Sequence, residues 1–328
     1  DNREAMRILL VKTSSLGDVI HNLPIVGDLA TQFPGVLIDW VVEESFAEIP
    51  QMHPQINSVI AVSIRRWRRE ILSRVTWQEI GAFRHRLRAE NYDFVIDTQG
   101  LLKSALITWS AKGVRCGYDA ASARESIASI AYDQKFNVPA SLHAVERNRT
   151  LAAMSVGNKI TRPVDYGIAQ RFDRLVTQST AVLLTATSRD DKLWPEAHWI
   201  ALGTCLSELG LTCQLPAGSA IERNRAARLS AAIPNAVALP SMSLKDLAQT
   251  LSCAQVVIGV DTGLVHLAAA LGRPTIALFC ASDPALTGVC ASTPVVNLGA
   301  CNAPPTISDV LNAVKAFAEL PVRQEQPL

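Results

Sequence analysis

The sequence predicts an α/β protein built from two doubly wound parallel sheets. Apolar runs alternate with helical patterns along nearly the whole chain, which is typical of parallel strands with helices on both faces. The alternation loses clarity between about 112 and 175 and then restarts. The chain has 328 residues, of which 48% are hydrophobic, and this is enough for two separate cores.

In the first half, the apolar run Arg7–Val11 predicts a strand, and a helix is expected from about Asp18 to Gln32. The remaining elements expected there are strands Leu37–Val42, Val59–Val62 and Phe94–Asp97 and helices Trp77–Ala89 and Leu101–Ser110. The second half is expected to have strands Ala181–Ala186, Thr212–Leu215, Ala236–Leu239, Gln255–Val260 and Thr275–Phe279, with helices between them.

These elements divide into an N-terminal domain over 6–165 and a C-terminal domain over 175–315, with a linker within 155–178 and a polar tail over 316–328. Ligands of such sheets bind beyond the carboxyl ends of the strands. Two domains facing each other would therefore form a ligand cleft between those ends. Met6 is the expected native start, and the apolar run after it is too short for a signal peptide.

Composition excludes several classes of protein. A net charge of +1 argues against bulk nucleic-acid binding, and no apolar run is long enough to span a bilayer. The seven cysteines are odd in number and lack C-x-x-C spacing, which favours a reducing cytoplasm over disulfides or structural zinc. No metal-ligand motif appears in the sequence.

The most informative stretch lies near the C-terminal end, where the apolar run Val256–Val260 ends at Asp261. Thr262 and Gly263 then open an Ala/Leu-rich helix. The unpaired N–H groups and the positive dipole end of such a helix favour an anion such as a diphosphate. An ordinary strand–helix joint capped by Asp or Thr explains the pattern equally well.

Two strand-end loops in the first half carry polar side chains. After the first strand, Asp18 either complements a helix dipole or takes a proton from a substrate hydroxyl. His21 lies three residues further on, where it either orients Asp18, contacts substrate or is structural. The second loop offers Asp97, Gln99 and Lys103, with structural capping as the alternative for Asp97.

An arginine-rich segment follows the third expected strand and includes Arg65, Arg66, Trp67 and Arg68. It has almost no acidic neighbour in the sequence except Glu70. A solvated face is the usual explanation of a charge run, but a cluster with few acids also suits an anionic substrate or an anionic membrane surface.

Two loops of the second half suit a nucleotide sugar. Lys192 follows the hydroxyls of Thr187 and Ser188 and can neutralise a leaving diphosphate without a metal. Glu222 can accept hydrogen bonds from sugar hydroxyls, or it can be an exposed acid at a helix start. Taken alone, each residue also fits a solvated loop.

Together these segments resemble a known family, the ADP-heptose-using lipopolysaccharide heptosyltransferases, which are inverting glycosyltransferases of family 9. The resemblance covers the chain from Met6 to about 315, and the start and the arginine cluster are closer to the first heptosyltransferase of the family than to the second. The matching segments, in order, are Thr13–Asp18, Ile64–Arg68, Asp97–Leu101, His143–Arg147, Arg189–Pro195 and Asp261–Leu267.

The resemblance implies a GT-B architecture of two Rossmann-like domains, with the donor bound by the C-terminal domain and the acceptor by the N-terminal one. It implies transfer of L-glycero-D-manno-heptose from ADP-heptose to the inner Kdo of Kdo2-lipid A, without a metal or other cofactor. The arginine cluster suggests a cytoplasmic protein attached peripherally, by electrostatic attraction, to the anionic inner-membrane surface, and high salt should weaken this attachment.

The resemblance assigns roles residue by residue. Asp18 matches the general base, and Lys192 matches the cation at the diphosphate. The donor contacts it implies are Thr187, Ser188, Lys192, Glu222, Asp261, Thr262, Gly263 and His266. The acceptor contacts it implies are Ser15, Gly17, His21, Arg65, Arg66, Arg68, Gln99, Arg124, His143 and Arg147.

The sequence departs from the family at Cys280-Ala281-Ser282, where Gly-Pro-Thr is usual before Asp-Pro. The alternatives are a related heptosyltransferase with another acceptor, a sugar-nucleotide epimerase of the same architecture, and a non-catalytic nucleotide-sugar or lipid-binding protein. The presence of Asp18 and Lys192 argues against the last.

Overall fold

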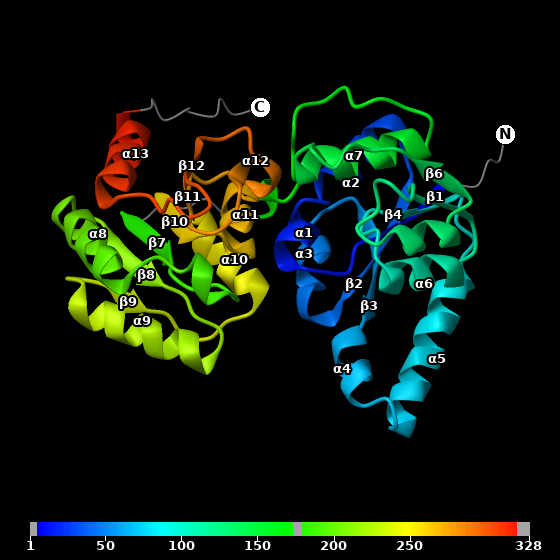
Figure 1. Cartoon of the computed structure of the whole chain (residues 1–328), viewed down its shortest axis with the longest axis horizontal. Helices are drawn as coiled ribbons and strands as arrows, with labels where there is room; N and C mark the ends of the chain where they lie inside the picture. Colours follow the sequence, from blue (N-terminus) through cyan, green and yellow to red (C-terminus); the bar gives the residue numbers. More distant parts are fainter. Residues whose placement is uncertain (1–4, 173–178, 320–328) are drawn as a thin grey trace. The chain divides into compact units, whose positions relative to one another are not determined.

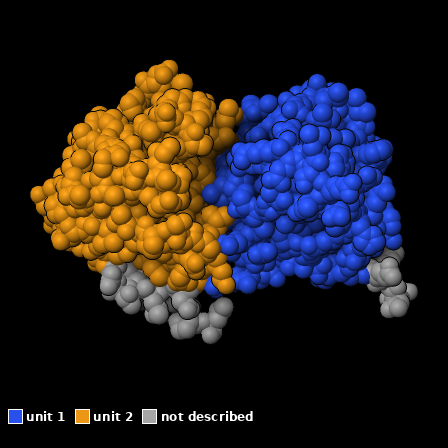
Figure 2. All heavy atoms as spheres, turned by 90° about the horizontal axis from the view of Figure 1, so that it is seen from below, with its two compact units in different colours: residues 1–171 blue, residues 172–328 orange. Residues whose placement is uncertain are grey.

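The computed structural model describes residues 5–172 and 179–319. The chain divides into two compact units, Asp1–Arg171 and Phe172–Leu328, which Figure 2 shows in blue and orange. Each unit contains one six-stranded sheet in which every strand pair is parallel. The predicted fold class, two doubly wound parallel sheets, is confirmed.

Unit 1 has the strand order β3-β2-β1-β4-β5-β6 (Figure 1). This is the order of a dinucleotide-binding doubly wound sheet, which reverses direction between β1 and β4. Its strands are β1 Arg7–Val11, β2 Leu37–Glu43, β3 Ile56–Val62, β4 Phe94–Asp97, β5 Val114–Tyr118 and β6 Gln134–Phe136. Its helices are α1 Leu16–Ile20, α2 Pro24–Gln32, α3 Glu48–Gln51, α4 Ile64–Arg69, α5 Arg74–Ala89, α6 Leu102–Ser110 and α7 Ala144–Ser155, with short η1 Glu44–Phe46, η2 Ser126–Ala131 and η3 Ala169–Arg171.

The core of unit 1 explains why its central strand is apolar throughout. Leu9 and Val11 pack with Leu87 of α5 and Ile107 of α6 on one face of the sheet. Successive residues of a strand point to opposite faces, so Ile8 and Leu10, which are also fully buried, point to the other. Helices α2 and α7 pack against each other (Figure 1). A strand covered on both faces reads as a continuous apolar run.

The predicted helix from Asp18 to Gln32 is wrong, because two helices with a turn between them occupy this segment. α1 ends at Ile20, and α2 begins with Pro24 at its first position. Proline has no N–H to donate to the preceding turn but fits the first turn of a helix, so it favours this break. The unclear segment after 112 contains β5, β6 and α7. The two strands there are short and only partly buried, which leaves little apolar pattern to detect.

Unit 2 repeats the arrangement with the order β12-β11-β10-β7-β8-β9. Its strands are β7 Thr180–Leu184, β8 Thr212–Leu215, β9 Val237–Ala238, β10 Val256–Val260, β11 Thr275–Phe279 and β12 Val295–Gly299. Its helices are η4 Asp190–Lys192, α8 Glu196–Glu208, α9 Ala220–Ala232, α10 Leu244–Ser252, α11 Gly263–Ala270, α12 Pro284–Thr287 and α13 Ile307–Glu319.

Two elements of unit 2 differ from expectation. The edge strand β12 was not predicted, and its partial exposure explains why its apolar pattern is weak. The predicted boundary of the polar tail at residue 316 is wrong, because helix α13 continues to Glu319. The rest of that tail lies outside the described residues, as do part of the expected linker and residues 1–4 of the expected N-terminal extension. None of the described helices is long and apolar enough to cross a membrane.

The topology places four loops where ligands of such sheets bind. In unit 1 the direction of the strand order reverses between β1 and β4, so the loops after Val11 and Asp97 emerge at that point. In unit 2 it reverses between β7 and β10, so the loops after Leu184 and Val260 emerge together. Crevices at this reversal are the usual binding sites of doubly wound sheets, and all four loops carry residues singled out in the sequence.

Candidate active site

In unit 1, the loop between β1 and α1 is held by the side chain of Gln99. Gln99 Oε1 accepts hydrogen bonds from Thr13 N at 2.8 Å, Thr13 Oγ1 at 3.2 Å and Ser14 N at 3.2 Å. Its Nε2 donates to Ser14 O at 2.5 Å. The side chain is only 2% exposed, so both ends of its amide are used inside the protein. Gln99 therefore shapes the loop that leads to Asp18, and the expectation that it contacts an acceptor loses its structural basis.

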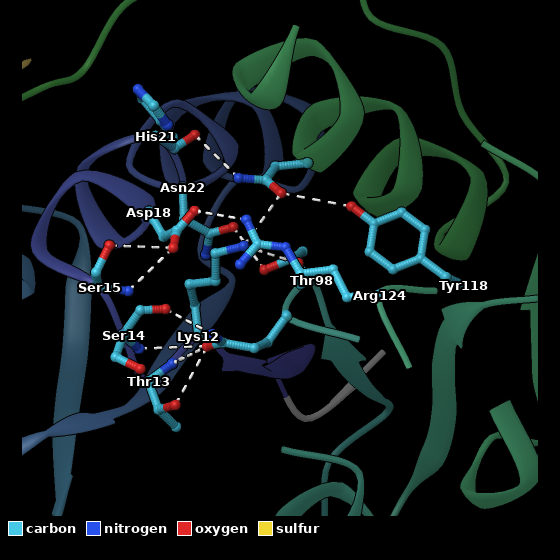
Figure 3. Close-up of polar contacts among 12 residues, drawn as sticks. Lys12, Thr13, Ser14, Ser15, Asp18, His21, Asn22, Thr98, Tyr118 and Arg124 are labelled. Atoms are coloured by element: carbon cyan, nitrogen blue, oxygen red, sulfur yellow. Dashed lines mark hydrogen bonds and ion pairs between the residues drawn. The ribbon is translucent and has the colours of Figure 1, made fainter. Parts of the chain in front are cut away.

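Asp18 lies at the end of this loop, in the first turn of α1 (Figure 3). Its Oδ2 accepts from Ser15 N at 3.0 Å and from Ser15 Oγ at 3.2 Å. Its Oδ1 accepts from Arg124 Nη2 at 3.0 Å. Burial alone would raise the pKa of Asp18, but the positive charges of Lys12 and Arg124 and the Ser15 N–H hold it well below its usual range. The carboxylate is ionised at neutral pH, and its side chain is 18% exposed.

Lys12 is the buried cation behind Asp18. Its Nζ donates to Thr98 O at 2.8 Å and lies 3.5 Å from Asn148 Oδ1. Burial lowers the pKa of Lys12 to about 8, although the charge of Asp18 acts in the opposite direction. Asn148 Oδ1 also accepts from Tyr118 (3.4 Å), so α7 and β5 complete this buried polar cluster (Figure 3).

Four further acceptor residues implied by the resemblance, Gly17, His21, His143 and Arg147, lie near this cluster or pack onto it. The rings of His21 and His143 meet edge to face with their centroids 5.7 Å apart. His143 caps α7 by accepting from Val145 N at 3.2 Å. The guanidinium carbon of Arg147 lies 4.8 Å from the ring centre of Tyr118, and Arg147 Nη2 donates to Ser122 O at 2.7 Å. Gly17 lies within α1 beside Asp18.

Asp97, by contrast, is a structural residue. Its Oδ1 accepts from the N–H groups of Gln99 and Gly100 at 2.8 and 3.2 Å, and its Oδ2 accepts from Tyr132 at 2.7 Å. It is fully buried, and burial raises its pKa. The structure therefore supports a structural role for Asp97, which stabilises the loop before α6 but does not cap that helix, since the N-cap residue of α6 is Leu101. Nearby, Lys103 Nζ reaches Ser14 Oγ at 2.7 Å.

The arginine cluster forms helix α4, and the interpretation that it lacks acidic partners is wrong for Arg66. Arg66 pairs with Glu79 at 2.9 Å and with Glu44 at 3.5 Å. Both acids are distant in sequence, so the local pattern could not reveal them. Arg65 and Arg68 remain exposed, and the guanidinium of Arg65 lies 5.5 Å from the ring centre of Phe46. A hollow of about 430 Å³ lies beside the helix, and its lining mixes both charges: Glu43, Glu44, Ser45, Arg65, Arg66, Arg69 and Glu70.

In unit 2, Asp261 joins the loops that follow β7 and β10. Lys192 Nζ contacts Asp261 Oδ2 at 2.6 Å, and Thr187 Oγ1 donates to Asp261 O at 3.2 Å. Ser282 Oγ donates to the same carboxylate oxygen at 2.5 Å. Ser282 belongs to the segment that departs from the family pattern, and its hydroxyl gives that segment a defined contact with the candidate donor loop.

Helix α11 begins at Gly263, two residues after Asp261. Thr262 is its N-cap residue, but its side chain makes no capping bond, so the first N–H groups of the helix are not capped by it. Gly263 is the first helical residue, and His266 is buried in the following turn. Ser188 is exposed in the loop after β7. The structure thus gathers Thr187, Lys192, Asp261 and Thr262 at the reversal point of the second sheet.

Glu222 has a structural role at the start of α9. Its Oε2 accepts from Gly218 N at 2.8 Å and from Ser219 N at 3.0 Å, and its own N–H donates to Ser219 Oγ at 3.2 Å. This reciprocal pattern is a capping box. The structure therefore supports the helix-start alternative for Glu222. Only Oε2 of its carboxylate takes part in the capping box, and Oε1 does not.

Comparison with known proteins decides the family. A family model described as glycosyltransferase family 9 (heptosyltransferase) matches residues 80–311. The chain is 47% identical over 321 residues to a lipopolysaccharide heptosyltransferase 1 of Escherichia coli O18:K1:H7, covering 96% of this chain and 97% of that protein. The chain belongs to glycosyltransferase family 9. The resemblance seen in its motifs is confirmed, and the chain is a glycosyltransferase of the heptosyltransferase family.

Solved structures of the family have the same fold. The structure of E. coli heptosyltransferase WaaC with ADP has a TM-score of 0.90 and 43% identity, covering 95% of this chain and all of that one. The structure of the same enzyme with ADP-2-deoxy-2-fluoro heptose has a TM-score of 0.83, covering 96% of this chain and 99% of that one. The GT-B architecture expected from the resemblance is confirmed.

Several residues of the candidate site were given no role from the sequence. Lys12, Asn148 and Tyr118 form the buried polar cluster behind Asp18. Lys12 stands at the start of the first loop motif, whereas Asn148 and Tyr118 look like ordinary core residues in the sequence. Ser282 was noticed only as part of a departure from the family pattern. No cluster of three or more His, Cys, Asp or Glu side chains suited to a metal occurs within residues 5–172 and 179–319.

Proposed function

We propose that this heptosyltransferase transfers L-glycero-D-manno-heptose from ADP-heptose to the inner Kdo of Kdo2-lipid A, with inversion at the anomeric carbon. The observation that carries the proposal is the position of Asp18, whose partly exposed carboxylate is held by Arg124 and Ser15 at the strand-order reversal of unit 1. The names of the relatives support a lipopolysaccharide heptosyl transfer. The ADP and fluoro-heptose analogue in the neighbouring structures support the donor.

In the proposed mechanism, Asp18 is the general base. The acceptor hydroxyl attacks the anomeric carbon while Asp18 removes its proton, a role that contributes about 10²–10⁴-fold to a rate. While Arg124 is paired with it, Asp18 is a weak base because of its low pKa. An anionic acceptor that takes Arg124 as its own partner would release one of these constraints. The pKa of Asp18 would then rise toward that of an effective base at the moment the acceptor binds.

On the donor side, we propose that Lys192 stabilises the negative charge that grows on the departing diphosphate. Lys192 now contacts Asp261 at 2.6 Å, so its ammonium group is already at the strand-order reversal of unit 2. The N–H groups at the start of α11 add the positive end of a helix dipole. Together they would supply the charge stabilisation for which other transferases use a divalent cation, and we propose that the reaction requires no metal.

The acceptor carries phosphate and carboxylate groups, for which the exposed guanidinium groups of Arg65 and Arg68 are suitable partners. Arg147 and His143 would complete this surface near Asp18. Arginines on this face would also attract the anionic cytoplasmic surface of the inner membrane. A related heptosyltransferase with another acceptor is the alternative.

Incubation with ADP-heptose tests the proposal, with and without Kdo2-lipid A. We expect ADP release and a heptosylated lipid only when both substrates are present. Release without acceptor dependence would contradict the assigned acceptor. An absence of release with both substrates, together with normal ADP binding, would contradict the assigned acceptor and favour transfer to another one. Added EDTA should leave the rate unchanged, and loss of activity in EDTA would contradict the metal-free mechanism.

A further inference from the structure

The connection between α4 and α5 exposes large apolar side chains that no other part of unit 1 covers. Leu72 is 96% exposed, Trp77 is 59% exposed, and Ile71 and Val75 are each 56% exposed. These four residues, here called the apolar tip, occupy the turn and the first helical turn of α5. α4 and the beginning of α5 project away from the rest of the unit (Figure 1). A cluster of this kind on a soluble domain indicates an interaction surface.

The structure holds the apolar tip in one conformation. Trp77 Nε1 donates to Ile71 O at 2.8 Å, which ties the helix start to the turn. Further along the two helices, Glu79 of α5 contacts two residues of α4: it accepts a hydrogen bond from Trp67 Nε1 at 2.7 Å and pairs with Arg66. The rings of Trp67 and Phe83 pack edge to face at 5.9 Å. The two helices are thus joined by polar and aromatic contacts, and the apolar tip is presented beyond them.

Exposed arginines lie next to the apolar tip in the sequence. Arg68, Arg69 and Arg74 are exposed, and within the described part of the chain their guanidinium groups form no ion pair or hydrogen bond. Residues 68–75 contain these three arginines and one acid, Glu70, so the segment that carries the apolar side chains has a net positive charge, although Arg69 also lines the mixed-charge hollow beside α4. An aromatic and aliphatic centre with arginines at its edge has the composition of segments that lie in the interface of an anionic bilayer.

We propose that the apolar tip inserts into the headgroup region of an anionic phospholipid bilayer, with Arg68, Arg69 and Arg74 contacting lipid phosphates. This inference rests on the proposed function, because it specifies the membrane partner that a lipid acceptor requires. It adds a hydrophobic anchor to the electrostatic attachment expected from the arginine cluster. Electrostatic attraction is screened by salt, whereas burial of apolar side chains is not.

The test is flotation of the full chain with vesicles of phosphatidylethanolamine and phosphatidylglycerol, at low salt and at about 0.5 M NaCl, where the Debye length is only a few ångströms. We expect the wild-type protein to remain bound at high salt. The variant Ile71→Ser/Leu72→Ser should lose about tenfold or more of its vesicle affinity there, given the transfer free energy of a buried leucine. The matched control is Leu209→Ser, because Leu209 is 56% exposed in unit 2, and it should bind as the wild type does.

Three results would overturn the inference: release of the wild-type protein from vesicles at high salt, unchanged binding of the double variant, and equal loss in the Leu209 control. A dimer that dissociates in the double variant, measured by light scattering, would assign the apolar tip to a second copy of the chain instead. Transfer to a short-chain, water-soluble Kdo acceptor separates this inference from the proposed function. That transfer should be unchanged in the double variant, and its absence in the wild type would contradict the function without affecting vesicle binding.

Discussion

Replacing Gln99 tests whether this residue holds the loop or contacts an acceptor. In Gln99→Met the side chain keeps its length but loses its amide. Thr13 N, Ser14 N and Ser14 O then lose their partners, which lie at 2.8, 3.2 and 2.5 Å. A buried polar group without a partner costs about 1–3 kcal/mol, so three such groups predict a loss of about 3–6 kcal/mol after some local relaxation. This is a large part of the roughly 5–15 kcal/mol that stabilises a typical domain.

Urea denaturation monitored by circular dichroism measures this loss, and hydrogen exchange at the amides of Thr13 and Ser14 locates it. The control is Gln78→Met on the exposed face of α5, which should change the free energy of unfolding by less than about 0.5 kcal/mol. The reasoning is refuted if Gln99→Met unfolds at the wild-type urea concentration while KM for the acceptor rises. That pattern would make Gln99 a direct acceptor contact.

Three further predictions follow from other residues. Lys192→Met should lower kcat by about 10²–10³-fold with ADP affinity changed far less, because charge stabilisation of a leaving group contributes about 3–4 kcal/mol; kcat within twofold of wild type in steady-state assays would remove Lys192 from the mechanism. The pKa of Lys12 is about 8 in the folded protein against 10.5 in the unfolded one. Between these pH values the unfolded state binds more protons, so the stability of the folded state rises with pH. The free energy of unfolding of the wild type should therefore rise by roughly 3 kcal/mol relative to Lys12→Met as pH increases from 8 to 10.5. Gly117→Ala should lower Tm, because the added Cβ would lie 2.3 Å from the ring of Tyr132. Gly81→Ala should raise the free energy of unfolding by about 0.5–1 kcal/mol, because Gly81 lies in the middle of α5 and nothing is within 4 Å of the added Cβ. Equal Tm values for the two variants would contradict this packing.

The fold was predictable because its strands are buried on both faces. β1, β4, β10 and β11 are short continuous apolar runs, and such runs alternating with helices favour one architecture. Edge strands such as β12 face solvent in part, so their pattern is weak. The helical pattern continues on both sides of Pro24 and predicts one helix, although a proline inside such a pattern favours a break.

The candidate site was predictable where a motif fixes the local backbone, and less so where distant segments supply the partners. Asp18, Lys192 and Asp261 were identified from loops at strand ends, and the structure brings Lys192 to Asp261. The partners of Arg66 and the bonds of Gln99 connect residues more than ten positions apart. Local spacing carries no information about such contacts. The sequence therefore suggested that Arg66 and Gln99 are available to a ligand, whereas Arg66 is paired with Glu79 and the Gln99 amide holds a loop.

The account depends most on Asp18 as the base that accepts the proton of the acceptor hydroxyl. Single-turnover transfer from ADP-heptose to Kdo2-lipid A by Asp18→Asn is the direct measurement, with ADP-heptose affinity determined on the same preparation. We expect the rate to fall by about 10²–10⁴-fold while donor affinity stays within about twofold of the wild type. A transfer rate close to that of the wild type, with the fold and donor binding intact, would contradict the central claim.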